Sequence, residues 1–304
     1  MLINKMFSSI DVHVLGEAYR IVVQSPILLS NGDVHVNNQV LQNNFSTEKK
    51  LLLNEPRGHR GINGCLILPS KTAKYQLLFF NHENVATFKY EGLAASLTAL
   101  LETGNLQRTK DDIYQIETNK GIYNIEANIV NGEVINIQIE NKHAHIMELS
   151  DEFRKVSIDN DRNYLVYELP NFIKSIDIIN LEAITTWGIE KTSQLNEQSV
   201  CYEGVILTKK QASSLQHFKT VTFEKDGYIK RTPGIDSTVA IFTSVVRDAS
   251  TNIQNETIFK SRLTATKVTG SEGKYILRLR PFVTGSHQFI LDNDDPLKNG
   301  FLLK

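Results

Sequence analysis

The sequence is poor in cysteine and proline, and it contains no long apolar run. Its two cysteines, Cys65 and Cys201, stand far apart and form neither a C-x-x-C pair nor a set with metal-ligand spacing. This argues against a disulfide framework and against a cysteine-ligated zinc site. No apolar stretch approaches the roughly 18 residues of a membrane-spanning helix, and the first residues lack the apolar core of a signal peptide. These absences predict a cytoplasmic protein.

Neither sign of charge is in excess. The chain has 33 Lys and Arg residues and 34 Asp and Glu residues, which gives a formal net charge of −1. Nucleic-acid binding depends on a basic patch, and attraction to an anionic membrane surface depends on a polybasic segment. The sequence shows neither feature, so we expect no nucleic-acid partner and no membrane partner.

The length of 304 residues suits two domains of ordinary size. No low-complexity linker separates the two halves of the chain, so the boundary should be tight and lie near residues 149–154. We therefore predict an N-terminal domain over residues 1–149 and a C-terminal domain over residues 150–285. The last segment, 286–304, is expected to join the N-terminal domain.

Strand patterns dominate both halves. Residues 19–23, 75–80 and 274–280 are runs of β-branched and aromatic residues. Residues 122–140 carry two such runs separated by Asn131-Gly132, which is a strong signal for a type I′ turn. We expect a β-hairpin at this point.

Two segments are apolar nearly all round and predict buried helices. One covers residues 92–103, is rich in Ala and Leu, and ends at Gly104, a residue suited to a helix C-terminus. The other covers residues 237–247. Each half thus offers many strands and one buried helix. The pattern indicates an α+β fold with a duplicated unit, in which a β-sheet wraps around a central helix.

Five motifs in sequence order resemble those of the proline racemase family, which includes 4-hydroxyproline epimerases and trans-3-hydroxyproline dehydratases. Each motif is weak alone, but together they span residues 11–301. The matching segments are Asp11-Val12-His13 through Ile21-Val22, Pro56-Arg57-Gly58-His59, Tyr167 with Asn171-Phe172, Arg231-Thr232-Pro233, and Thr284-Gly285 through Phe289, Asp292 and Asp295-Pro296 to Gly300-Phe301.

This resemblance implies an isomerase that needs no cofactor and acts on a small amino or imino acid. It implies two pseudo-symmetric domains of the diaminopimelate-epimerase type, with an active cleft between them. Many relatives are homodimers, so a homodimer is the implied assembly. A cysteine at the start of each central helix would act as acid or base, and the helix N-terminus would hold the substrate carboxylate. The substrate-binding positions implied in this chain are Gly92, Asn171, Phe172, Ser237, Thr238, Asp292 and His59.

The sequence departs from the family at both cysteine positions. Lys89 stands where the first cysteine is expected, and Glu91 stands where the motif has histidine. Gly234 stands in place of the second cysteine, with Asp236 two positions later. Proline racemisation by two thiols is therefore not expected of this chain.

Two interpretations of Lys89, Glu91 and Asp236 remain open. In the first, Asp236 and Glu91 cap their helices, occupy the anion site of the substrate, and leave an inactive family member that binds a small ligand or a protein. In the second, the three residues form a new catalytic set for an isomerase or a lyase. Desolvation beside a helix N-terminus favours the neutral amine of a lysine and thus a general base, whereas acidic neighbours favour a salt bridge.

The remaining candidate residues give weaker evidence of a catalytic or binding role. His143 and His145 have strand spacing that places both rings on one face, but no third metal ligand is identifiable, so no metal site is predicted. Asp11 and His13 are expected to be structural. Arg57, like His59, is a candidate for lining the cleft. Trp187 is expected to serve in packing.

Overall fold

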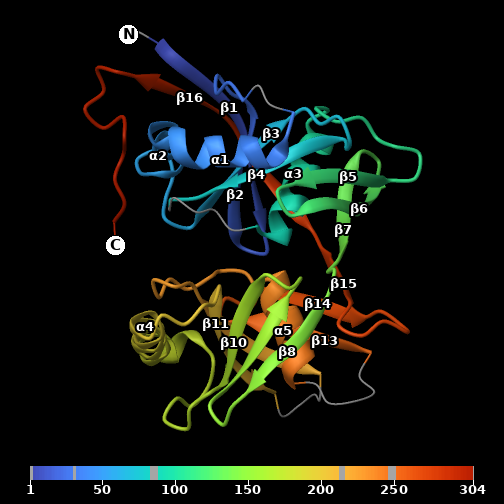
Figure 1. The fold of residues 1–304 in the computed structure, drawn as a ribbon, viewed down its shortest axis with the longest axis vertical. Coiled ribbons are helices and arrows are strands. Elements are labelled where there is room, and N and C mark those ends of the chain that lie inside the picture. Colours follow the sequence, from blue (N-terminus) through green and yellow to red (C-terminus); the bar gives the residue numbers. More distant parts are fainter. Residues whose placement is uncertain (1–2, 30–31, 83–87, 212–215, 246–250, 304) are drawn as a thin grey trace. The chain divides into compact units, whose positions relative to one another are not determined.

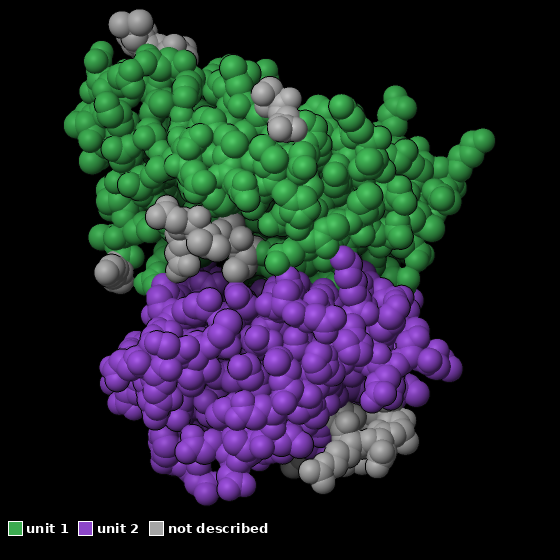
Figure 2. Space-filling view, viewed as in Figure 1, with its two compact units in different colours: residues 1–138, 279–304 green, residues 139–278 purple. Residues whose placement is uncertain are grey.

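The computed structural model describes residues 3–29, 32–82, 88–211, 216–245 and 251–303. The chain divides into two compact units (Figure 2): unit 1 contains residues 1–138 and 279–304, and unit 2 contains residues 139–278. The division falls earlier than residues 149–154 because β8 (Ala144–Leu149) pairs with β9 (Phe153–Ile158) inside unit 2.

Unit 1 is a curled sheet around one buried helix. The C-terminal strand β16, red in Figure 1, lies beside the N-terminal strand β1, and α3 packs against β1, β2, β3, β4 and β16. Helices α1 (Val34–Asn44) and α2 (Ser46–Leu53) supply apolar side chains to a second core outside the sheet. The strand order is β16 (Pro281–Asp292), β1 (Ile3–Val14), β2 (Glu17–Gln24), β3 (Ile62–Leu68), β4 (Tyr75–Phe80), β5 (Ile113–Thr118), β6 (Gly121–Val130) and β7 (Glu133–Glu140).

Unit 2 has the same architecture. Helix α5 packs against β8, β9, β10, β13 and β14, while the short helix η1 (Ile178–Asn180) precedes α4 (Leu181–Glu197). Apolar residues of α4 pack with side chains of β10, β11 and β12 in a separate core. The strand order is β15 (Tyr275–Leu279), β14 (Arg262–Lys267), β13 (Asn252–Thr257), β12 (His217–Phe223), β11 (Gly204–Lys210), β10 (Arg162–Glu168), β9 and β8.

The two units repeat one topology, which confirms the predicted α+β fold with a duplicated sheet-and-helix unit. In unit 1, β2 and β3 are parallel, β3 and β4 are antiparallel, and β4 and β5 are parallel. In unit 2, β10 to β13 follow the same sequence of pairings. The parallel pair that ends each series is joined by a crossover containing the buried helix, as parallel strands require.

The central helices begin earlier than predicted. Helix α3 (Tyr90–Glu102) is buried over its first eleven residues and is followed by Gly104 with a φ of +73°. Helix α5 (Ile235–Val245) also starts two residues early, and positions 246–247 of the prediction lie outside the described residues. Among the described residues, no helix combines the length and the hydropathy of a membrane span.

The hairpin prediction is confirmed. Strands β6 and β7 pair antiparallel, and the turn residues Asn131 and Gly132 have φ values of +52° and +84°. Both values are positive, as a type I′ turn requires.

Candidate functional site

Lys89 lies at the N-cap position of α3 and is held by two side chains from neighbouring strands. Its ammonium group donates a hydrogen bond to Oδ1 of Asn63 on β3 at 2.8 Å, and it lies 3.9 Å from the carboxylate of Glu17 on β2. Asn63 in turn donates its amide to Glu17 at 3.1 Å. The parallel register of β2 and β3 brings these residues together, since Ala18 pairs with Ile62. Lys89 is therefore a half-buried cation in a fixed polar set.

Cys65 belongs to the same neighbourhood, although sequence distance gave no reason to include it. It follows Asn63 by two residues on β3 and is fully buried. A Cβ placed on Gly92 would lie 3.4 Å from its sulfur. Burial raises the pKa of the Cys65 thiol far above its ordinary value, although the nearby charge of Lys89 acts in the opposite direction. Cys65 is thus a protonated packing residue next to the start of α3.

Glu91 and Gly92 occupy the first turn of α3 and are both buried. The absence of a side chain at Gly92 lets α3 approach β4, because an added Cβ would meet the Phe79 ring at 2.4 Å. Gly92 therefore has a packing role in addition to any role in binding.

The start of α5 differs from the sequence prediction. Gly234, with a φ of +69°, precedes the first helical residue, so Asp236 is the second residue of α5 and does not occupy the N-cap position. Its carboxylate accepts hydrogen bonds from Nε and Nη2 of Arg162 at 2.8 and 3.1 Å, and from the Tyr164 hydroxyl at 3.0 Å. The expected capping role of Asp236 is therefore replaced by an ion pair with β10.

Arg162 gathers several acidic side chains around a buried guanidinium. It pairs with Asp159 at 3.0 Å and Asp161 at 3.1 Å in addition to Asp236. Burial alone would lower the pKa of Arg162, but the Asp236 and Asp159 charges hold it well above its ordinary value. Burial and the neighbouring Asp236 also raise the pKa of Tyr164. The phenol therefore remains a hydrogen-bond donor.

Ser237 and Thr238 use their hydroxyl groups inside unit 2. Ser237 accepts a hydrogen bond from Thr222 at 2.9 Å, and both side chains are buried. Thr238 donates to the carbonyl of Gly234 at 2.7 Å and accepts from the Asn255 amide at 3.0 Å. These contacts stabilise the first turn of α5, so the two hydroxyls are engaged in structural hydrogen bonds.

The remaining predicted binding residues lie elsewhere. Asn171 and Phe172 are exposed in the segment after β10. Asp292 ends β16 opposite Ile3, whereas Glu17 lies opposite Val14 at the other end of β1. Eleven residues of strand separate these ends, on the order of 30 Å. Unit 1 therefore does not bring Asp292 to Lys89.

The Pro-Arg-Gly-His segment binds the C-terminal motif. Arg57 forms an ion pair with Asp295 at 3.1 Å and donates to the carbonyls of Leu297 and Lys298. His59 accepts a hydrogen bond from the Gly61 amide at 3.1 Å. The expectation that Arg57 lines a cleft is replaced by this anchoring role.

The opening motif is also structural in its contacts. Arg20 donates two hydrogen bonds to the carboxylate of Asp11, at 3.0 and 2.7 Å. The His13 ring stacks on Phe282 with ring centroids 5.3 Å apart. Both contacts tie β1 to neighbouring strands.

The rings of His143 and His145 share one face of the chain and stack with centroids 5.2 Å apart. Within the part of the chain that the structure describes, no group of three or more His, Cys, Asp or Glu side chains could hold a metal ion.

Comparison with known proteins supports the sequence resemblance. A family model described as "Proline racemase" matches residues 9–159. The chain is 28% identical to trans-3-hydroxy-L-proline dehydratase from Bacillus thuringiensis subsp. konkukian over the whole of both chains. It is 21% identical to proline racemase from Acetoanaerobium sticklandii, with 99% of each chain covered.

A solved structure shares the fold. The hydroxyproline epimerase from Agrobacterium vitis, which contains bound trans-4-OH-L-proline, aligns with a TM-score of 0.83 at 19% identity. The alignment covers 100% of this chain and 96% of the epimerase. At this identity the likeness concerns the fold alone.

Proposed function

Because this chain belongs to the proline racemase family, we propose that it turns over a small amino or imino acid without thiol chemistry, with Lys89 as its acid–base group. The observation that carries the proposal is the polar set of Lys89, Asn63 and Glu17 at the start of α3. It supplies a titratable amine, fixed in position, at the place where the family motif has a cysteine.

The residues at the starts of α3 and α5 suit a reaction with a single base better than they suit inversion of a carbon centre. Inversion at a carbon centre by proton transfer uses an acid and a base on opposite faces of the substrate. Gly234 has no side chain to supply the second group, and Arg162 neutralises the carboxylate of Asp236. We therefore favour an elimination that Lys89 completes alone.

The proposed reaction is the loss of water from a 3-hydroxy imino acid, the chemistry for which the dehydratase relatives are named. In molecules whose Lys89 has given up its extra proton, the neutral amine removes the proton from Cα, and the electron pair left on Cα forms a double bond to Cβ. The bond from Cβ to the hydroxyl oxygen breaks, and Lys89 returns the proton to that oxygen. Water leaves, an unsaturated imino acid remains, and Lys89 ends in its starting state.

Proton NMR in deuterated water tests this function. The wild-type protein, Lys89→Met and the exposed-site control Lys110→Met are each mixed with trans-3-hydroxy-L-proline, proline and the 4-hydroxyprolines. We expect loss of the Cα–H and Cβ–H signals of the 3-hydroxy substrate, with growth of the ring signals of the dehydrated product, with the wild type and Lys110→Met. Lys89→Met should lower this rate by at least about 100-fold, the usual contribution of a general base. Turnover by Lys89→Met at the wild-type rate would refute the role of Lys89.

A second candidate is a binding protein without turnover. It is favoured by the ion pairs that hold Lys89 and Asp236, since each candidate acid–base residue already has a protein partner. Saturation-transfer NMR with the same compounds separates the two candidates. A compound that receives saturation from the protein, but keeps its Cα–H signal during long incubation at high protein concentration, binds without being turned over. That result would favour the binding protein and contradict the proposed enzyme.

A further inference from the structure

Unit 2 contains a cavity of about 850 Å³ at the C-terminal end of α5. Its volume lies within the range of small-molecule sites. Thr243, which lines it, follows Gly234 by nine residues, and a helix rises about 1.5 Å per residue, so the cavity lies roughly 13 Å along α5 from Gly234. The cavity is therefore separate from the start of α5, and a ligand bound in it would be independent of the function proposed for Lys89 in unit 1.

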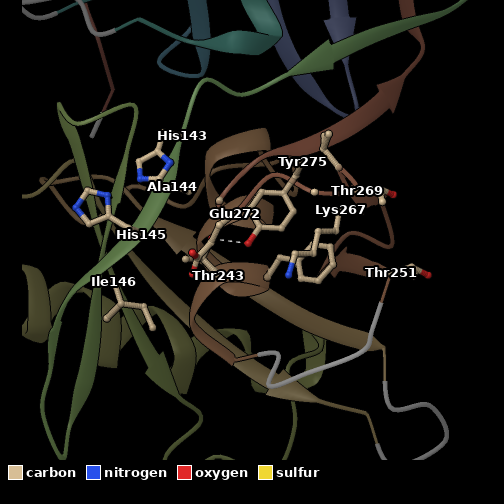
Figure 3. A pocket seen from close by; sticks show the side chains of 14 residues that line it. His143, Ala144, His145, Ile146, Thr243, Thr251, Lys267, Thr269, Glu272 and Tyr275 are labelled. Carbon is tan, nitrogen blue, oxygen red and sulfur yellow. Dashed lines mark hydrogen bonds between the residues drawn. The ribbon is translucent and has the colours of Figure 1, made fainter.

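Four of the residues that line the cavity carry flat rings, namely His143, His145, Phe242 and Tyr275, and the last two are buried apart from a small exposed fraction. Tyr275 and Phe242 lie with ring centroids 4.6 Å apart, and the Tyr275 hydroxyl is 3.1 Å from the Thr243 hydroxyl. The stacked rings of His143 and His145 lie on one side of the view in Figure 3, with Tyr275 and Lys267 on the other. Aromatic faces of this kind favour a ligand with a planar ring. In addition, Nδ1 of His145 is buried without a hydrogen-bond partner among the described residues.

Two opposite charges lie in the cavity lining. Lys267 ends β14, and Glu272 lies in the turn that leads into β15. Both residues are exposed, and neither forms an ion pair or a side-chain hydrogen bond within the described residues. Thr251 and Thr269 also line the cavity. The cavity thus offers an ammonium group, a carboxylate and neutral hydrogen-bonding groups around aromatic walls.

We propose that this cavity binds a zwitterionic amino acid with an aromatic side chain. Lys267 recognises the ligand carboxylate and Glu272 its ammonium group, while the ring packs against Tyr275 and the histidine pair. A ligand with only one charge would leave one of the two protein charges without a partner, so the zwitterion is preferred to a simple acid or amine.

Calorimetry on the full chain tests the proposal with three probes that share one ring: L-phenylalanine, phenylacetate and phenethylamine. We expect L-phenylalanine to bind about threefold more tightly than either singly charged probe, because an ion pair with an exposed side chain adds only a modest gain in affinity. Lys267→Gln should abolish its advantage over phenethylamine, and Glu272→Gln should abolish its advantage over phenylacetate. Lys210→Gln, at an exposed position on β11 outside the cavity, should change none of the three affinities.

NMR locates the binding independently of the affinities. The Hε1 signals of His143 and His145 should shift with L-phenylalanine, and His143→Ala and His145→Ala assign them. The proposal is overturned by any of three outcomes: no binding at millimolar L-phenylalanine, equal affinity for the three probes, or binding that shifts neither histidine. Thermal unfolding of each variant checks that it is folded before its affinity is compared.

Discussion

At the level of single side chains, each central helix begins beside an ion pair. The helix start contributes the cation of the pair in unit 1 and the acid in unit 2. In unit 1 the cation Lys89 belongs to the helix start and Glu17 to the first residue of β2. In unit 2 the acid Asp236 belongs to the helix start and Arg162 to the first residue of β10. Strands β2 and β10 occupy equivalent places in their sheets. Both units therefore have an ion pair between the helix start and the first residue of this strand, with the positive and negative partners exchanged.

This arrangement makes Arg162 essential for stability. Replacing it with Met removes the cation that compensates the carboxylates of Asp159 and Asp236, whose side chains are only 3% and 12% exposed, so the variant should lose about 3–5 kcal/mol of unfolding free energy. Arg154→Met is the control, because its partner Glu168 is 71% exposed and such pairs contribute about 0–1 kcal/mol. Urea unfolding measures both variants. Equal losses of unfolding free energy in the two variants would show that the Arg162 cluster stabilises the protein no more than an exposed ion pair does.

Glu256 should make stability sensitive to acid. Its burial acts to raise its pKa, but the hydrogen bond from Arg262 and the charges of Arg262, His217 and Lys219 lower the pKa below the ordinary carboxyl value of 4.5. A pKa lowered by folding stabilises the protein above the unfolded value, and this stability is lost as the pH falls through the folded value.

The Glu256→Gln variant tests this dependence. The free-energy gap between wild type and Glu256→Gln should be widest at about pH 6 and should narrow steadily towards about pH 3. Chemical unfolding across this range measures the gap. A gap that stays constant with pH would mean that Glu256 contributes by packing alone.

Among the helices and strands, Gly92 shows why a binding motif can also be a packing requirement. Gly92→Ala forces a methyl group against the Phe79 ring and should cost about 1–3 kcal/mol of stability even without ligand. Gly32→Ala is the matched control, since its new methyl meets only the flexible end of Lys71 at 3.4 Å. Denaturant midpoints compare the two. If Gly92→Ala is as stable as Gly32→Ala, the glycine is kept for a reason other than α3 packing.

The elements were predictable where their signals are local. The all-round apolar pattern of the central helices and the Asn131-Gly132 turn each lie within a dozen residues, and both predictions are confirmed. The site partners were not predictable in this way. Asn63 stands 26 positions from Lys89, and Arg162 stands 74 positions from Asp236. Only the packing of each central helix against its sheet brings such residues together, and a single sequence carries no signal for that packing.

The start of α5 shows how a small error in a predicted helix boundary can also give the wrong partner for a side chain. The prediction that Asp236 is an N-cap depended on a helix starting near Ser237. The structure begins α5 two residues earlier, after the positive φ of Gly234, and this shift moves the carboxylate away from the capping position. An error of two residues in a helix boundary is ordinary, yet here it changes the partner of a charged side chain.

For the chain as a whole, the duplicated architecture is continuous in one unit and split in the other. Unit 2 is a single stretch, residues 139–278, whereas unit 1 needs the C-terminal segment 279–304. That segment supplies β16, which pairs along almost the whole of β1, and it places Phe289 and Leu291 in the core beside α2. The segment also carries Asp295, the partner of Arg57.

The two units should therefore differ when they are separated. A fragment of residues 139–278 should fold alone and unfold cooperatively, because its sheet and helix are complete within about 140 residues, an ordinary domain size. A fragment of residues 1–138 should be unfolded, because β1 loses one of its two partner strands and the core loses two apolar side chains. Joining residues 279–304 to it through a flexible linker should restore folding. Circular dichroism and thermal unfolding measure all three, and a stable fold for 1–138 alone would show that β16 is dispensable to unit 1.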